Sequence, residues 1–103
     1  MGEIARWTTP TLWYKPKEAE ISEIVAVYAV ISQIGRPVIQ KSIEEAIIVD
    51  GGFLWRFTQE EMGILTQHIT GKIKIDYKTN TGDRFTTRAF EYAISGSAVD
   101  GVI

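Results

Sequence analysis

The only histidine of the chain, His68, and two adjacent carboxylates, Glu60 and Glu61, are the residues best suited by type to acid–base or metal chemistry. Adjacent residues on a helix do not face each other, so the two glutamates are poorly placed to act as a pair. A metal site needs several ligands, and the chain has no cysteine and no second histidine. Nothing in the sequence brings a serine and an aspartate beside His68 to form a triad. We therefore predict no catalytic residue, no metal, no cofactor and no enzymatic activity.

Three other stretches resemble site motifs, but each lacks a residue or a structural context that its motif requires. The segment 70–73 contains the Gly-Lys pair of a phosphate loop, but Ile73 replaces the required serine or threonine. The segment 76–82 is similar to a calcium loop, but Lys78 stands at a ligand position. The segment 95–101 lacks the strand-turn-helix context of a serine nucleophile. None of the three predicts a binding site.

The stretch that holds the two glutamates has the signals of a helix N-terminus. Thr58 followed by Glu61 forms a capping box, in which each side chain accepts a hydrogen bond from the other residue's amide. Phe57 and Met62 flank this box as a hydrophobic staple. Acidic residues in the first turn also suit the helix dipole. These signals predict one short helical turn near residues 58–65.

The remaining elements must be strands, because the apolar residues mostly alternate with a period of two. The segment 22–33 is apolar at nearly every position, which predicts a central strand buried on both faces, with a buried helix as the competing interpretation. The segment 46–57 predicts a hairpin with its turn at 50–52. The segment 6–16 predicts one extended strand that is interrupted or bent near Pro10.

A second hairpin is predicted over residues 71–94, with its turn at 80–82. Its return arm changes alternation, since Phe85 lies on odd positions and the later apolar residues lie on even ones. A β-bulge of one residue between Thr86 and Ala89 would reconcile the two halves. The whole chain then reads as an all-β, antiparallel β-sandwich of about seven strands.

Length and composition are consistent with one such domain. The chain has 103 residues, of which 45% are hydrophobic, and carries a net charge of −2. This charge disfavours nucleic acid as a partner. The N-terminus has no apolar signal segment, and no apolar run is long enough for a bilayer, so neither secretion by a signal peptide nor membrane insertion is expected. We predict one domain over residues 1–94 and a flexible C-terminal tail over residues 95–103.

The aromatic residues divide into a predicted core and a predicted surface. Those that alternate on strands are assigned to the core: Phe53, Trp55, Phe57, Tyr77 and Phe90. Adjacent residues of a strand point to opposite faces, so one of Trp13 and Tyr14 should face outward. Trp7, Trp13 and Tyr14 are therefore the candidate interface residues, with half-buried edge packing as the alternative. Pro10 is best tolerated at a sheet edge, so the strand over residues 6–15 is expected to be that edge.

Two motifs resemble those of small phage and prophage proteins from tail and baseplate gene clusters. The first is Arg6-Trp7-Thr8-Thr9-Pro10-Thr11, similar to an R-G-T-T-P-T motif with Trp7 at the glycine. The second is Phe57-Thr58-Gln59-Glu60-Glu61-Met62, similar to L-T-Q-E-E-T, with Gly71 opening the strand that follows.

This resemblance implies an immunoglobulin-like sandwich without enzymatic activity, located in the virion or in the host cytoplasm during assembly. Its partners would be other virion proteins or copies of itself, as a homo-oligomer. A small carbohydrate-binding module that stacks a sugar on Trp13 or Tyr14 is the alternative function.

Overall fold

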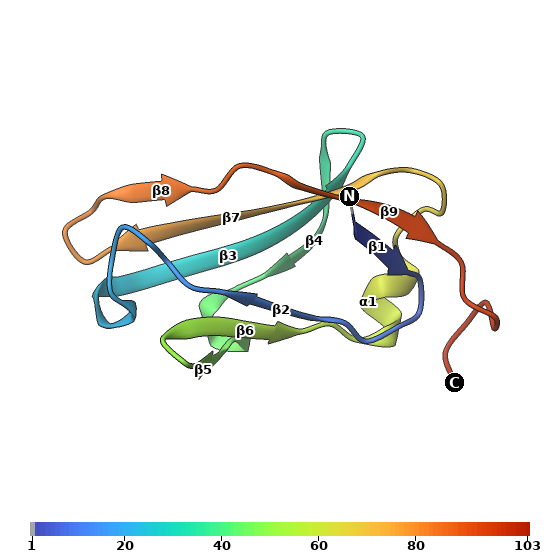
Figure 1. The fold of residues 1–103 in the computed structure, drawn as a ribbon, viewed down its shortest axis with the longest axis horizontal. Coiled ribbons are helices and arrows are strands. Elements are labelled where there is room, and N and C mark those ends of the chain that lie inside the picture. Colours follow the sequence, from blue (N-terminus) through green and yellow to red (C-terminus); the bar gives the residue numbers. More distant parts are fainter. Residues whose placement is uncertain (1) are drawn as a thin grey trace.

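Nine strands in two facing sheets make up the computed structural model, which describes residues 2–103 (Figure 1). The larger sheet contains, in spatial order, β1 (Gly2–Ala5), β9 (Phe90–Ser95), β7 (Gly71–Thr79), β3 (Ile24–Gln33) and β4 (Arg36–Lys41), with β8 (Arg84–Thr86) beside β7. The smaller sheet contains β2 (Thr11–Tyr14), β6 (Gly52–Arg56) and β5 (Ile47–Val49). The helical elements are α1 (Gln59–Gly63) and two 3₁₀ turns, η1 (Ile21–Glu23) and η2 (Ile43–Glu45).

The predicted all-β sandwich is confirmed, with two differences in its strands. The described residues form nine strands rather than about seven. β1 lies before the predicted N-terminal strand, β4 lies in a segment for which no strand was predicted, and the return arm of the second hairpin divides into β8 and β9. One pairing, β1 with β9, is parallel, so the sandwich is not wholly antiparallel. The molecule is elongated, with principal extents of 45 × 26 × 19 Å.

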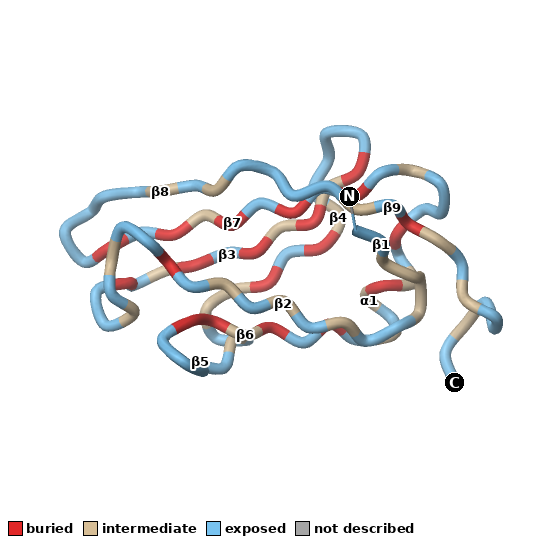
Figure 2. The backbone as a smooth tube through the Cα atoms, in the orientation of Figure 1, coloured by how far each residue is buried: buried red, intermediate tan, exposed pale blue. Residues whose placement is uncertain are grey.

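The segment 22–33 is mostly strand, and the helical alternative is wrong. β3 pairs with β7 on one side and β4 on the other, so the predicted central position is confirmed. Burial on both faces is wrong, because Val25 and Tyr28 are 55% and 42% exposed. The smaller sheet covers one face of the larger sheet, and no part of the described chain forms a third layer over the opposite face of β3 (Figure 2). A run of apolar residues therefore does not require two covered faces.

Both predicted hairpins form. In the β5–β6 hairpin, Asp50 and Gly51 have φ angles of 51° and 73°, the left-handed values that a two-residue turn between twisted strands requires. In the second hairpin, Asp76 pairs with Thr86, whereas Ile73 pairs with Phe90. Two residues of β7 thus oppose three of the return arm, which confirms the predicted one-residue bulge.

The predicted N-terminal strand is wrong in its first half. β1 ends at Ala5, residues 6–10 form a turn, and β2 begins only at Thr11. Trp7 causes the break, because its φ of 66° is left-handed and incompatible with a strand. β2 is an edge strand of the smaller sheet, so the predicted edge position holds for this shorter strand.

The core lies between the two sheets. Trp55 and Phe53 of β6 are almost fully buried and pack with apolar residues of β3 and β7. The Trp55 Nε1 donates a hydrogen bond to the Ser42 carbonyl at 2.9 Å, so the buried ring has no unsatisfied polar atom. The core assignments of Phe57 and Tyr77 are also confirmed. The remaining core assignment, Phe90, is wrong.

Phe90 is 42% exposed although it pairs with the buried Ile73. β1 flanks β9 only from Tyr92 to Ser95. Phe90 therefore lies beyond the end of the neighbouring strand, at an open edge of the larger sheet. The alternation of apolar residues predicted the correct face of the sheet for the Phe90 side chain. It could not show that the neighbouring strand β1 does not extend as far as Phe90.

The short helical turn forms where it was predicted. The Thr58 hydroxyl accepts a hydrogen bond from the Glu61 amide at 3.2 Å, and the Glu61 carboxylate accepts one from the Thr58 amide at 2.8 Å. The staple residues Phe57 and Met62 are buried in the same cluster. α1 therefore closes the open end of the sandwich at the crossing from the smaller sheet to the larger (Figure 1).

Replacing Thr58 by alanine is expected to lower the free energy of unfolding by about 1 kcal/mol, because it removes the hydroxyl that caps α1. Urea denaturation followed by tryptophan fluorescence measures this loss. Thr58→Ser is the matched control, since serine supplies the same cap and should retain most of the stability. Equal stability of the alanine variant and the parent would show that the cap does not contribute.

Candidate functional site

The residues best suited by type to acid–base chemistry lie in a loop, for His68, and on α1, for Glu60 and Glu61. His68 is exposed in the loop before β7, with a φ of 70°, and its backbone amide donates to the Ile94 carbonyl at 3.0 Å. Glu60 is exposed on α1, and Glu61 is bound to the cap. Over residues 2–103 no three side chains of histidine, aspartate or glutamate come together in a group that could hold a metal ion.

A lysine between two carboxylates is the most buried charged cluster of the described residues. The Lys41 side chain is only 8% exposed, and its Nζ lies 2.7 Å from Glu61 and 3.3 Å from Glu45. The same ammonium lies 5.6 Å from the centre of the Phe57 ring. The ion pairs thus connect β4 of the larger sheet with η2 and α1, two elements at which the chain crosses between the sheets.

The protonation of this cluster is fixed by its own charges. Burial lowers the pKa of Lys41, but hydrogen bonds and charge attraction from Glu61 and Glu45 outweigh it, so the net shift is upward. Burial raises the pKa of Glu61, but the bonds from Lys41 and from the Thr58 amide lower it below its ordinary value. A lysine with a raised pKa is a poor base or nucleophile, so the cluster is better suited to stabilising the fold than to catalysis.

Trp7 lies at the end of the molecule beside α1. Its ring covers Gly63 so closely that a Cβ on that glycine would be 2.2 Å from the ring. Its Nε1 donates to the Asp100 carboxylate at 2.8 Å. Arg6 donates to the Gly63 carbonyl at 2.8 Å and forms an ion pair with Asp100 at 3.2 Å. Trp7 therefore joins the N-terminal turn, α1 and the C-terminal segment, and is half-buried.

The C-terminal segment is in contact with the rest of the chain. Besides the contacts of Asp100, the backbone of Ile103 exchanges two hydrogen bonds with the Gln59 side chain, at 2.8 and 3.1 Å. The segment forms no strand after Ser95. Its predicted flexibility stays a prediction.

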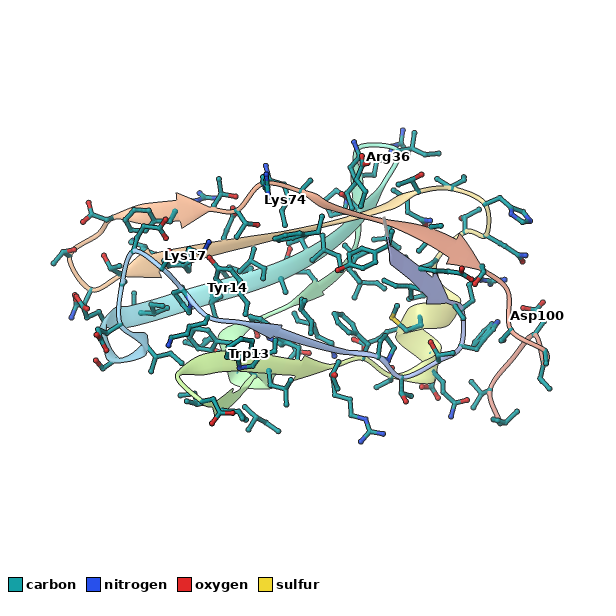
Figure 3. All side chains as sticks on the ribbon, in the orientation of Figure 1. Trp13, Tyr14, Lys17, Arg36, Lys74 and Asp100 are labelled. Atoms are coloured by element: carbon teal, nitrogen blue, oxygen red, sulfur yellow. The ribbon has the colours of Figure 1, made fainter. Side chains whose placement is uncertain are left out.

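Trp13 lies on the outer face of the smaller sheet and is 45% exposed (Figure 3). Its ring crosses β6 above Gly52, where a Cβ would be 2.6 Å from the indole nitrogen. The Nε1 donates to the Val49 carbonyl of β5 at 2.9 Å. Trp13 thus spans the three-stranded sheet from one edge toward the other, with a large part of the ring in contact with solvent.

Tyr14 faces the opposite way, as expected for the next residue of a strand. Its ring lies 6.2 Å from that of Tyr77, inside the sandwich. Burial raises the pKa of Tyr14 and also that of Tyr77, whose hydroxyl donates to Glu18. The three candidate interface residues therefore do not meet: Trp7 lies at one end, Trp13 on the outer face and Tyr14 toward the core.

The apolar surface beside Trp13 was not predicted from the sequence. Trp13 and Ile47 both pair with Leu54, so these three side chains form a row across the outer face of the smaller sheet. Val49 lies on the same face two residues further along β5, opposite Gly52. We call Trp13, Ile47, Val49 and Leu54 the outer apolar face.

All three residues of β5 are exposed: Ile47 and Ile48 are 63% exposed and Val49 is 36% exposed (Figure 2). Three consecutive β-branched residues beside a tight turn were the available signal. The predicted hairpin did not reveal this exposure, because alternation does not show which arm of a hairpin lies at a sheet edge.

The outer face of the larger sheet differs in chemistry. A hollow there is lined partly by Lys74, Asp76 and Arg84. The Asp76 carboxylate accepts hydrogen bonds from Thr86 at 2.5 Å and from Arg84 at 2.7 Å, and these two lower its pKa. Asp76, Arg84 and Thr86 thus bond to one another, whereas none of the ion pairs among residues 2–103 includes Lys74.

Comparison with protein-family models, curated proteins and solved structures finds no match to this chain. In the part of the chain that the structure describes, no helix has the length and apolar character needed to cross a membrane. The function must therefore be inferred from the surfaces themselves and from the two sequence motifs.

Proposed function

We propose that this chain is a non-enzymatic structural protein of a phage or prophage, a tail or baseplate building block with an immunoglobulin-like sandwich that acts through protein–protein contacts. The observation that carries the proposal is the outer apolar face. A tryptophan and aliphatic side chains gather there on a small open sheet, next to the unpaired edge of β5. Contiguous exposed apolar surface of this kind is typical of protein contacts.

The positions of the two phage-like motifs support the proposal. The Phe57 amide donates to the Pro10 carbonyl at 3.0 Å, and Arg6 donates to the Gly63 carbonyl beside the second motif. The motifs are separated in sequence but pack together at one end of the sandwich. Trp7 occupies the place of the glycine in the motif that it resembles, and its positive φ is a conformation that glycine adopts freely. The resemblance thus involves residues that shape one corner of the fold.

A small carbohydrate-binding module is the second candidate, because Trp13 presents an exposed ring. Sugar recognition also needs hydrogen-bonding side chains around the aromatic platform. The residues in register with Trp13 across the sheet are Leu54 and Ile47, which are aliphatic. A glycan array separates the two candidates: the structural role predicts no binding, and binding that Trp13→Ala abolishes would favour the module.

Particles purified from the source strain after prophage induction are expected to contain the chain, as detected by mass spectrometry and located by cryo-electron microscopy. Trp13→Ser should reduce its incorporation, because it removes the largest side chain of the outer apolar face. Val25→Ser is the control, since Val25 is comparably exposed on the opposite sheet. Absence of the chain from particles would refute the proposed function, and normal incorporation of Trp13→Ser would exclude the outer apolar face as the contact.

A further inference from the structure

We infer that β5 is a docking edge for an extended segment of a partner protein that is apolar in its middle and basic at its ends. The segment would add a fourth strand to the smaller sheet. The inference rests on the proposed function, since it names the partner chemistry for the same surface. Among the described residues, 2–103, β5 pairs only with β6, so one side of its backbone has no neighbouring strand there.

The backbone of β5 is oriented for such an addition. Val49 and Gly52 enclose a two-residue turn, which makes them the first hydrogen-bonded pair of the hairpin. Alternate residues of an antiparallel strand direct their N–H and C=O groups to opposite sides. Ile48 therefore directs its amide and carbonyl to the open side, where the backbone of an incoming strand can bond to both.

β5 also lacks the side chains that protect sheet edges from pairing. Edge strands are commonly guarded by charged side chains, proline or bulges. β4, at an edge of the larger sheet, carries Arg36 and Pro37 within the strand. β5 has three β-branched aliphatic side chains instead, all of them exposed.

The charges at the ends of β5 define the partner. Glu44 and Glu45 precede the strand and Asp50 follows it, and all three are exposed. Glu45 is paired with Lys41, whereas none of the ion pairs among residues 2–103 includes Glu44 or Asp50. Lys15 lies near the turn beside Gly51, so the end at Glu44 is the more strongly acidic of the two. Basic residues at the ends of an added strand would complement these carboxylates.

The same charges disfavour a second copy of this chain as the occupant. Antiparallel pairing of two β5 strands about Ile48 would bring Asp50 of each copy beside the glutamates that precede β5 in the other. Like charges would then meet at both ends of a contact only three residues long. The exposed apolar side chains favour association, and the flanking charges select a basic segment for it.

Two synthetic peptides test the inference on the intact protein. They share the core Val-Thr-Val-Thr-Val; one carries a lysine pair at each end and the other a glutamate pair. In nuclear magnetic resonance titrations, the lysine peptide is expected to shift the amide signals of residues 46–50 and to bind at least ~tenfold more tightly than the glutamate peptide. Added salt should reduce this difference.

A matched pair of variants locates the site. Ile48→Lys adds a charge to the open edge and is expected to weaken binding of the lysine peptide by about tenfold or more. Val25→Lys adds the same charge at a comparably exposed strand position of the other sheet and should leave binding unchanged. Both variants are first checked for a folded spectrum.

Equal affinity for the two peptides, signal changes away from β5, or unchanged binding by Ile48→Lys would overturn the inference. Self-association in sedimentation equilibrium that Ile48→Lys abolishes would assign the edge to a second copy and overturn it as well. The particle experiment is independent. Particles that contain the chain while the lysine peptide fails to bind refute only this inference, and peptide binding with the chain absent from particles refutes only the proposed function.

Discussion

Replacing Gln33 by methionine is expected to lower the free energy of unfolding by about 2–4 kcal/mol. Gln33 is 7% exposed at the end of β3 and makes three hydrogen bonds to backbone groups of the loop between α1 and β7. Its Nε2 donates to the carbonyls of Thr66 and Ile69, and its Oε1 accepts from the Thr66 amide, each at 2.9 Å. Methionine retains the volume but leaves these groups without partners, at about 1–3 kcal/mol for each one that water cannot reach.

Urea denaturation measures the loss, and hydrogen exchange at the Thr66 amide shows whether the loop is released. Gln40→Met is the matched control, because Gln40 is exposed on β4 and should tolerate the same change. A loss below about 0.5 kcal/mol, with the Thr66 amide still protected, would mean that the loop does not depend on Gln33.

Interactions close in sequence were predictable, and those between distant segments were not. The cap of α1 involves residues three apart, and the β5–β6 turn involves adjacent ones, so both were evident from local chemistry. The role of Gln33 depends on residues 33 and 36 positions away. No local pattern encodes such a contact, because it arises only after β3 and β7 have paired.

The candidate site was predicted in part for the same reason. Alternation correctly placed Trp13 and Tyr14 on opposite faces of a strand. It could not show that Trp7 has a left-handed backbone. The Trp7 ring packs on Gly63 and donates a hydrogen bond to Asp100, and both residues are distant from it in sequence. Likewise, the exposure of β5 depends on which strand of the smaller sheet is outermost, and the order of strands is a property of the whole fold.

The outer apolar face and the charged cluster of Lys41 are linked through neighbouring segments of the chain, η2 and β5. η2 carries Glu45, which is paired with Lys41, and β5 begins two residues after η2 ends. The ion pair therefore fixes the point from which the exposed strand starts. A change that weakens the Lys41 cluster would loosen the anchor of β5 as well as the contact between the sheets.

Replacing Lys41 by methionine is expected to lower the free energy of unfolding by about 1–3 kcal/mol at pH 7. Methionine retains most of the buried stem beside Phe57 but leaves Glu61 and Glu45 without their shared cation. Removing one partner of a fully buried ion pair costs roughly 3–5 kcal/mol, and the expected loss is smaller here because both carboxylates keep contact with water. Lys72→Met is the control, since Lys72 forms a surface pair with Glu91 at 3.5 Å and both side chains are about half exposed.

The pH dependence of this loss identifies its electrostatic origin. The pKa values of Glu61 and Glu45 are lowered on folding, so their contribution is present above the ordinary value of 4.5 and is lost as the pH falls through the folded pKa. The pKa of Lys41 is raised, so its contribution is complete below 10.5 and is lost only as the pH rises through the folded value above that. The difference in stability between the parent and Lys41→Met should therefore be constant from about pH 6 to pH 9 and shrink below pH 4.5. Urea denaturation at pH 7 and pH 3 measures it, and a difference that is the same at both would show that Lys41 stabilises the fold by packing alone.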